Sequence, residues 1–170
     1  YARTLYDDTL SYEEIAEDYF SCAFGEDWKE FYDYLDELGR TFDHSYMCGQ
    51  KNKKAGVSGF YNPDKVADFK RVPEITARGM ELIKSHYNSD YRVRTVSVRL
   101  LEYHAEFASL LAEAMIPKCQ GDDAGAWAKY EILKDKMGAH EQAIEMYYDH
   151  CLAMNALRAR IFDKVSNEYM

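Results

Sequence analysis

The chain has 170 residues, and its 21 Lys and Arg against 30 Asp and Glu give a formal net charge of −9 at pH 7. This excess of acid argues against nonspecific binding to nucleic acid or to anionic membranes, because both attract basic surfaces. No apolar run approaches the ~20 residues of a membrane-spanning helix, and the chain is shorter than the ~250 residues of a complete (β/α)₈ barrel. We expect one domain over residues 1–170, and the start at Tyr1 without an initiator Met predicts a piece of a longer polypeptide.

A helical period dominates the first part of the chain. Apolar side chains recur at helical spacing over residues 12–23, and Ser11 with Glu14 forms a capping box before them. Gly25 suits the left-handed residue that follows a helix. The same spacing continues over residues 28–42. The short connection predicts an antiparallel hairpin of two helices.

Residues 48–62 lose this period and are predicted to form the one long loop. Pro63 suits the first position of a short helix. We expect that helix to stop at Val72, because the residue before Pro73 avoids the α region. A further helix is predicted over residues 73–87.

Residues 93–114 keep a 3.6-residue period. Their Val-rich start would also suit a short strand, but the period favours a helix. Asp90 is a candidate cap for this helix, and we expect Pro117 and Gly121 to end it.

The C-terminal part is predicted to contain one more long helix and a helix-compatible tail. The helix opens at Asp122 or Asp123 and carries apolar side chains as far as Cys151, and the tail covers residues 152–162. The expected fold is therefore an all-α, single-domain bundle of about six helices with one long loop near residues 48–62. The expected core comprises Phe20, Trp28, Phe31, Leu35, Leu100, Phe107, Leu111, Trp127, Leu133 and Ile144.

Neither the cysteines nor the histidines match a metal-binding pattern. The cysteines are far apart, which argues against a closed zinc site, and we interpret them as mostly buried free thiols that favour a reducing compartment. No histidine follows a Glu by three residues, as a di-iron bundle requires. We expect His104 to be half-buried and hydrogen-bonded, and the acidic run over residues 13–18 to be a solvated helix face. We predict no catalytic residue, no metal and no cofactor.

The loop carries the candidate ligand-binding residues. Three lysines concentrate positive charge in an acidic chain, and aromatic side chains beside them could stack on a sugar ring. The alternative is a solvated loop that contacts nothing. The candidates are Lys51, Lys53, Lys54, Tyr61 and Asn62, with Phe60 as a second ring next to them.

Four short segments resemble a known family. They are Leu5-Tyr6-Asp7, residues 14–20, Phe24-Gly25 and Tyr34-Leu35. They are similar to the helical region that follows the TIM barrel in a bacterial family of glycoside-hydrolase-like proteins with the label "domain of unknown function". Residues 145–149 resemble the end of that region, and the most specific part of the resemblance covers residues 5–42.

The resemblance implies a non-catalytic accessory domain that buttresses an adjoining TIM barrel of the same polypeptide. Such a domain could form one edge of a carbohydrate-binding cleft, with the loop reaching toward the barrel or a bound sugar. The family's catalytic carboxylates would lie in the barrel, so none transfers to this chain. The alternative is a stand-alone helical protein-interaction or scaffold domain that recognises a partner through an exposed aromatic patch.

Overall fold

The computed structural model describes residues 6–54 and 59–164. Within them it has eight α-helices, six of which have eight or more residues, and no strand, so the predicted all-α class is confirmed. The helices are α2 (Tyr12–Phe24), α3 (Trp28–Phe42), α4 (His44–Met47), α5 (Lys65–Ser85), α6 (Arg92–Gln120), α7 (Asp123–Gly138), α8 (Glu141–Ile144) and α9 (His150–Leu157), and a π-helical turn (Arg158–Phe162) follows. None of the described helices combines the length and hydropathy of a membrane span.

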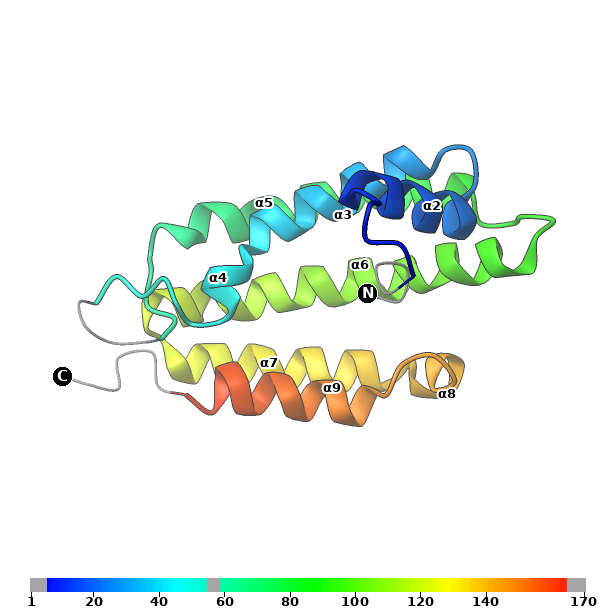
Figure 1. Ribbon diagram of the computed structural model, residues 1–170. Coiled ribbons are helices and arrows are strands. Elements are labelled where there is room, and N and C mark those ends of the chain that lie inside the picture. The colour runs from blue at the N-terminus through cyan, green and yellow to red at the C-terminus, as the bar shows by residue number, and fades with distance from the viewer. Residues whose placement is uncertain (1–5, 55–58, 165–170) are drawn as a thin grey trace.

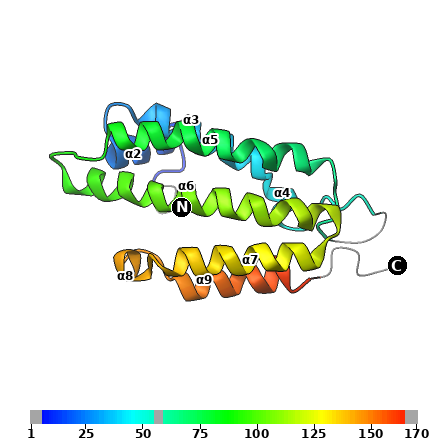
Figure 2. The ribbon, with the colours of Figure 1, turned by 180° about the vertical axis from the view of Figure 1, so that it is seen from behind.

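The helices form three tiers. Helices α2, α3 and α5 lie on one side of the long helix α6, and α7 and α9 lie on the other (Figures 1 and 2). The larger core cluster joins side chains of α3, α5, α6, α7 and α9. A smaller cluster around Phe31, Ile83 and Val98 lies near the start of α6. Helix α6 therefore contributes to both parts of the core.

The first two helices begin and end as predicted. The Ser11 side chain accepts a hydrogen bond from the backbone N–H of Glu14 at 3.2 Å, and the Glu14 carboxylate accepts one from the Ser11 N–H at 2.8 Å. Gly25 has the expected positive φ of 91°, but its ψ of −147° lies outside the left-handed helical region. The rings of Phe24 and Phe31 stack at 4.6 Å, which joins α2 to α3.

Pro73 does not interrupt its helix, so the prediction of two helices here is wrong. Helix α5 runs through it without a break. A proline inside a helix removes one backbone hydrogen bond at a cost of roughly 3 kcal/mol. The helix continues because it buries side chains on both sides of the proline, from Phe69 to Ile83. The Thr76 hydroxyl also lies 3.1 Å from the carbonyl oxygens of Val72 and Pro73.

Helix α6 has a different start from the one predicted. Tyr91 precedes it without a side-chain cap, so Asp90 is not the cap. Thr95 forms this connection instead, since its hydroxyl donates to the Ser89 carbonyl at 3.0 Å and accepts from the Ser89 N–H at 3.1 Å. The helix also continues past Pro117, and it ends at Gly121, which is left-handed as expected.

The predicted long helix after Asp122 is divided into α7, α8 and α9. Asp122 caps α7, and the helix ends at Gly138. A Cβ on Gly138 would lie 3.3 Å from Nε2 of His150, so the missing side chain lets this imidazole pack closely. Asp149 then begins α9 by accepting a hydrogen bond from the Leu152 N–H at 2.8 Å. The apolar pattern is continuous, but the Asp149 cap and the packing of His150 on Gly138 accompany a division of the predicted helix.

Only part of the predicted core is fully buried. Phe31, Leu111, Leu133 and Ile144 are buried as expected. The others are partly open to solvent, namely Phe20, Trp28, Leu35, Leu100, Phe107 and Trp127. All four cysteines are free thiols, but three are exposed and only Cys119 is buried, so the expectation of mostly buried thiols is wrong. The exposed ones occupy outer helix positions or the end of α4.

Candidate functional site

An apolar groove lies between α3 and α6. We call it the α3–α6 groove. Its cavity volume is about 300 Å³, and its lining includes Leu35, Leu38, Phe42, Met47, Phe107 and Leu111. Helices α3 and α4 supply one wall, and α6 supplies the floor.

The groove exists because two helices carry wider apolar stripes than their neighbours cover. The helical spacing of Leu35 and Phe107 predicts the core, and both are only partly buried. Phe42 and Met47 are also partly buried and pack against the edge of the larger cluster. Residues with a core-like spacing but an open face are typical of a surface that receives another apolar group.

A second hollow, of about 230 Å³, lies on the other side of Phe107. We call it the α6–α8 pocket. Phe107 and His104 belong to both hollows. The other lining residues of the pocket are Leu100, Tyr103, Met137, Ile144, Tyr147 and Tyr148.

His104 stands where the two hollows meet. The residue as a whole is exposed, although apolar side chains surround its ring. Its imidazole has no hydrogen-bond partner among the described residues, so the expectation of a hydrogen-bonded histidine is wrong. The apolar side chains around the ring limit its hydration and lower the pKa of His104 below the usual value. The imidazole is therefore neutral at pH 7, with a free donor and a free acceptor.

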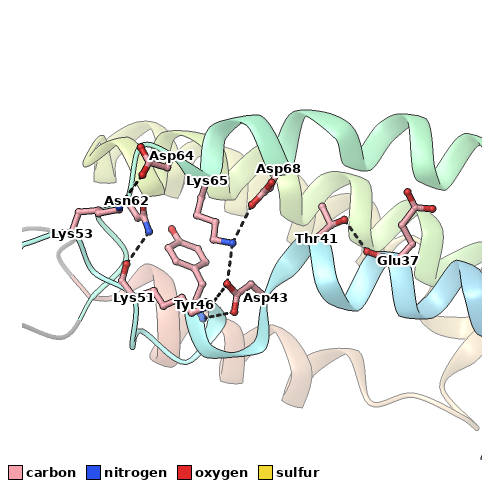
Figure 3. A network of polar contacts seen from close by, with 10 residues as sticks. All are labelled: Glu37, Thr41, Asp43, Tyr46, Lys51, Lys53, Asn62, Asp64, Lys65 and Asp68. Atoms are coloured by element: carbon pink, nitrogen blue, oxygen red, sulfur yellow. Dashed lines mark hydrogen bonds and ion pairs between the residues drawn. The ribbon is translucent and has the colours of Figure 1, made fainter.

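The long loop is tied to the bundle through Asp43 (Figure 3). The Asp43 carboxylate lies 2.5 Å from Nζ of Lys51 and 3.0 Å from Nζ of Lys65. Lys65 also pairs with Asp68 at 3.0 Å. The hydrogen bond from Lys51, followed by that from Lys65, holds the pKa of Asp43 well below its usual range. A carboxylate between two ammonium groups is thus the anchor of this loop.

Three of the predicted ligand-binding residues, Lys51, Lys53 and Asn62, form contacts within the protein itself. Lys51 pairs with Asp43, and Lys53 pairs with Asp64 at 2.8 Å. Asn62 is 5% exposed, and its side-chain amide donates to the Lys51 carbonyl at 2.9 Å. The positive charge of these two lysines is therefore balanced within the chain.

Tyr61 and Lys54 complete the predicted set. Tyr61 is half-buried, and its carbonyl accepts a hydrogen bond from the Lys53 N–H at 2.8 Å. The Lys54 N–H donates to the Asn52 side chain at 2.7 Å, and no acid pairs with the Lys54 ammonium among the described residues. Lys54 and Tyr61 are thus the members of the set with groups open to a ligand.

Phe60 is not the exposed ring that the sequence suggests. It is 2% exposed and packs edge-on against Tyr46, with the ring centroids 5.9 Å apart. The Tyr46 hydroxyl donates to the Phe60 carbonyl at 2.7 Å, and burial raises the pKa of Tyr46. Phe60 holds the loop against the core, so it presents no stacking face.

The surroundings of Cys151 do not favour a role as a nucleophile. Its thiol lies 3.7 Å from the Glu141 carboxylate in a polar cleft between α7 and α9. The negative charge of Glu141 raises the pKa of Cys151, so the thiol stays protonated at neutral pH. Among residues 6–54 and 59–164, no three His, Cys, Asp or Glu side chains form a group that could hold a metal ion.

No protein-family model, no curated protein and no solved structure matches the chain. Sequence reasoning identified the loop but missed both hollows. The signal for them was present in the apolar stripe of α6, which is broad enough to face two neighbours at once and includes His104.

Proposed function

We propose that this protein is a non-catalytic helical accessory domain that docks on a neighbouring protein surface through the α3–α6 groove. The resemblance over residues 5–42 suggests the partner, a glycoside-hydrolase-like TIM barrel of the same polypeptide. In that arrangement the domain buttresses the barrel and forms one edge of its carbohydrate cleft.

The observation that carries this proposal is the open apolar face of the groove. Leu35, Phe42, Met47 and Phe107 all line it, and all are partly exposed. Burying apolar surface yields roughly 25 cal/mol per Å², so covering several such side chains favours association. A buttressing domain needs a fixed apolar contact of this kind more than it needs a polar site.

The loop lies beside the same surface. Met47 ends α4, and the loop begins within two residues of it. The Asp43–Lys51 pair fixes the first part of the loop. A partner seated in the groove would thus meet the loop as well, and Lys54 and Tyr61 are the side chains with groups available to contact it or a bound sugar.

A matched pair of methionine substitutions in the protein encoded by the complete reading frame tests the proposal. Met47→Asp places a charge in the groove, whereas Met146→Asp changes a residue that is 85% exposed and lies outside it. We expect Met47→Asp to separate the unfolding of this domain from that of its neighbour in calorimetry, and Met146→Asp to leave one shared transition. Unchanged coupling in Met47→Asp, with the helical circular dichroism intact, would overturn the docking role.

A stand-alone interaction domain is the second candidate, and α2 supports it. No residue of α2 is buried. Tyr12 and Tyr19 are 67% and 66% exposed and lie seven residues apart, on one face of the helix. Exposed tyrosines are common in protein interfaces. This face would form the aromatic patch that such a domain requires.

The reading frame around Tyr1 discriminates between the two candidates. A barrel-sized region encoded before Tyr1 supports the accessory domain. An initiator Met immediately before Tyr1 supports the stand-alone domain, and Tyr12→Ala with Tyr19→Ala should then abolish partner capture while Met47→Asp does not.

A further inference from the structure

The α6–α8 pocket has an apolar interior. Leu100 and Phe107 come from α6, Met137 from α7 and Ile144 from α8. Met137 and Ile144 are each 2% exposed, so the wall opposite α6 is a well-packed one. An apolar cavity of about 150 Å³ is large enough for benzene. The 230 Å³ of this pocket therefore suits one ring with a small substituent.

Specific contacts hold the pocket in shape. His140, between α7 and α8, has its Nε2 2.9 Å from the Glu106 carboxylate on α6, and its ring meets that of Tyr103 edge-on at 5.0 Å. The turn after α8 is closed by hydrogen bonds from the Tyr147 and Tyr148 N–H groups to the Ile144 carbonyl at 2.8 and 2.9 Å. The two sides of the pocket are thus linked by polar and aromatic contacts.

The polar groups at the pocket are uncharged. The tyrosine side chains of Tyr103, Tyr147 and Tyr148 and the imidazole of His104 are its polar members. Burial raises the pKa of Tyr148, and the lowered pKa of His104 keeps its ring neutral. A charged ligand would lose its hydration here without meeting a counter-charge, which is costly.

We propose that the α6–α8 pocket binds a neutral, largely apolar ligand of about one substituted ring, whose single hydrogen-bonding group meets His104 or Tyr148. The apolar walls select against charge and large polar surface. The neutral imidazole can either donate to or accept from a hydroxyl, a carbonyl or an amide of the ligand.

Binding of p-cresol to the whole chain tests this proposal. Its methyl-bearing ring and its neutral hydroxyl match the pocket, and benzoate and benzylammonium provide charged rings of similar size. We expect saturable shifts in the methyl NMR signals of Met137 and Ile144 with p-cresol, and affinities weaker by about tenfold or more for both charged rings. The absence of saturable shifts, or equal affinity for all three, would overturn the proposal.

Substitutions at Leu100 test whether p-cresol binds in the α6–α8 pocket. Leu100→Trp places a larger side chain in the pocket, and Val93→Trp is the matched control because Val93 is 52% exposed on the same helix. We expect the first to abolish p-cresol binding and the second to leave it unchanged. Leu100→Phe provides a milder change if Leu100→Trp does not fold. Wild-type binding by a folded Leu100 variant would contradict the assignment.

The proposal of a ligand site in the α6–α8 pocket and the proposal of docking through the α3–α6 groove can be refuted independently. The pocket is measured with p-cresol and Leu100, whereas docking is measured with Met47, which lines only the groove. A protein that retains coupled unfolding but shifts no methyl signal would refute the pocket alone. A protein that binds p-cresol but shows no Met47 effect would refute the docking alone.

Discussion

Tyr34 on α3 lays its ring directly on Gly79 of α5. A Cβ on Gly79 would lie 2.2 Å from Cε2 of Tyr34, well inside contact distance. Burial raises the pKa of Tyr34 to about 12. Its hydroxyl has no hydrogen-bond partner among the described residues. The missing side chain of Gly79 therefore sets how closely α3 and α5 approach.

We expect Gly79→Ala to destabilise the protein by roughly 1–3 kcal/mol, the usual cost of overpacking. Alanine raises intrinsic helix stability by about 1 kcal/mol, but the backbone and ring cannot both stay in place. Urea denaturation measures the free energy of unfolding.

Gly39→Ala is the matched control. Gly39 lies inside α3, and a Cβ there would have no atom within 4 Å. We expect it to stabilise the protein by about 0.5–1 kcal/mol. In a Tyr34→Ala background, Gly79→Ala should lose most of its cost. Equal effects at both glycines would contradict the contact.

The period of apolar residues predicts the helices better than it predicts their ends. It identifies α2, α3 and α6 and their apolar faces, because a spacing repeated over many residues is a stronger signal than any single side chain. Pro73 shows the limit of local rules, since tertiary burial on both sides of it keeps α5 continuous. At Gly138 the apolar spacing continues but the helix ends, and His150 packs closely on this glycine.

The candidate site was less predictable for a related reason. Periodicity reports which side chains avoid water but not which neighbour covers them. Leu35, Leu100 and Phe107 have the same helical spacing as buried Phe31, yet they are only partly buried and line the two hollows. The loop sequence contains three lysines close together, but only the fold shows that Asp43 and Asp64 neutralise two of them.

Asp43→Asn should weaken the protein mainly above pH 4. The pKa of Asp43 is depressed by Lys51 and then Lys65, so its ionised form stabilises the fold at pH values above the ordinary carboxyl pKa of about 4. This stability is lost as pH falls through the depressed folded-state pKa. Hydrogen bonds to charged groups are worth about 1.5–3 kcal/mol, and we expect a loss of that order at pH 7.

Melting temperature against pH measures this effect. Asparagine tolerates the positive φ of 58° at position 43 and can still accept from the Tyr46 N–H. The wild-type and Asp43→Asn curves should converge at low pH. Asp64→Asn removes an exposed pair and should change little. Parallel curves for Asp43→Asn and wild type across the whole pH range would contradict the network.

His86 should make stability fall as pH rises near neutrality. Its Nε2 lies 2.9 Å from the Asp27 carboxylate, and this hydrogen bond raises the pKa of His86 above its usual 6.5. The charged pair contributes fully below pH 6.5, and the contribution is lost as pH rises through the raised folded-state pKa. Asp27 is 57% exposed at its side chain, so we expect less than about 1 kcal/mol.

The His86 effect is measured as the difference in unfolding free energy between pH 6 and pH 8.5. We expect Asp27→Asn to remove most of that difference. Added salt should reduce it in the wild type, because the pair is partly exposed. A pH dependence that survives in Asp27→Asn would assign the titration to another group.

Tyr46→Phe tests whether the loop is fixed by one buried hydrogen bond. The substitution keeps the ring packing but leaves the Phe60 carbonyl without its 2.7 Å partner. A buried acceptor without a partner costs about 1–3 kcal/mol, and we expect that loss in the free energy of unfolding.

Amide hydrogen exchange should also accelerate at Gly59 and Asn62, whose N–H groups donate to Gly49 and Cys119. Tyr19→Phe, at a tyrosine that is 66% exposed, is the control and should change neither quantity. A neutral Tyr46→Phe with unchanged exchange would show that Phe60 packing alone anchors the loop.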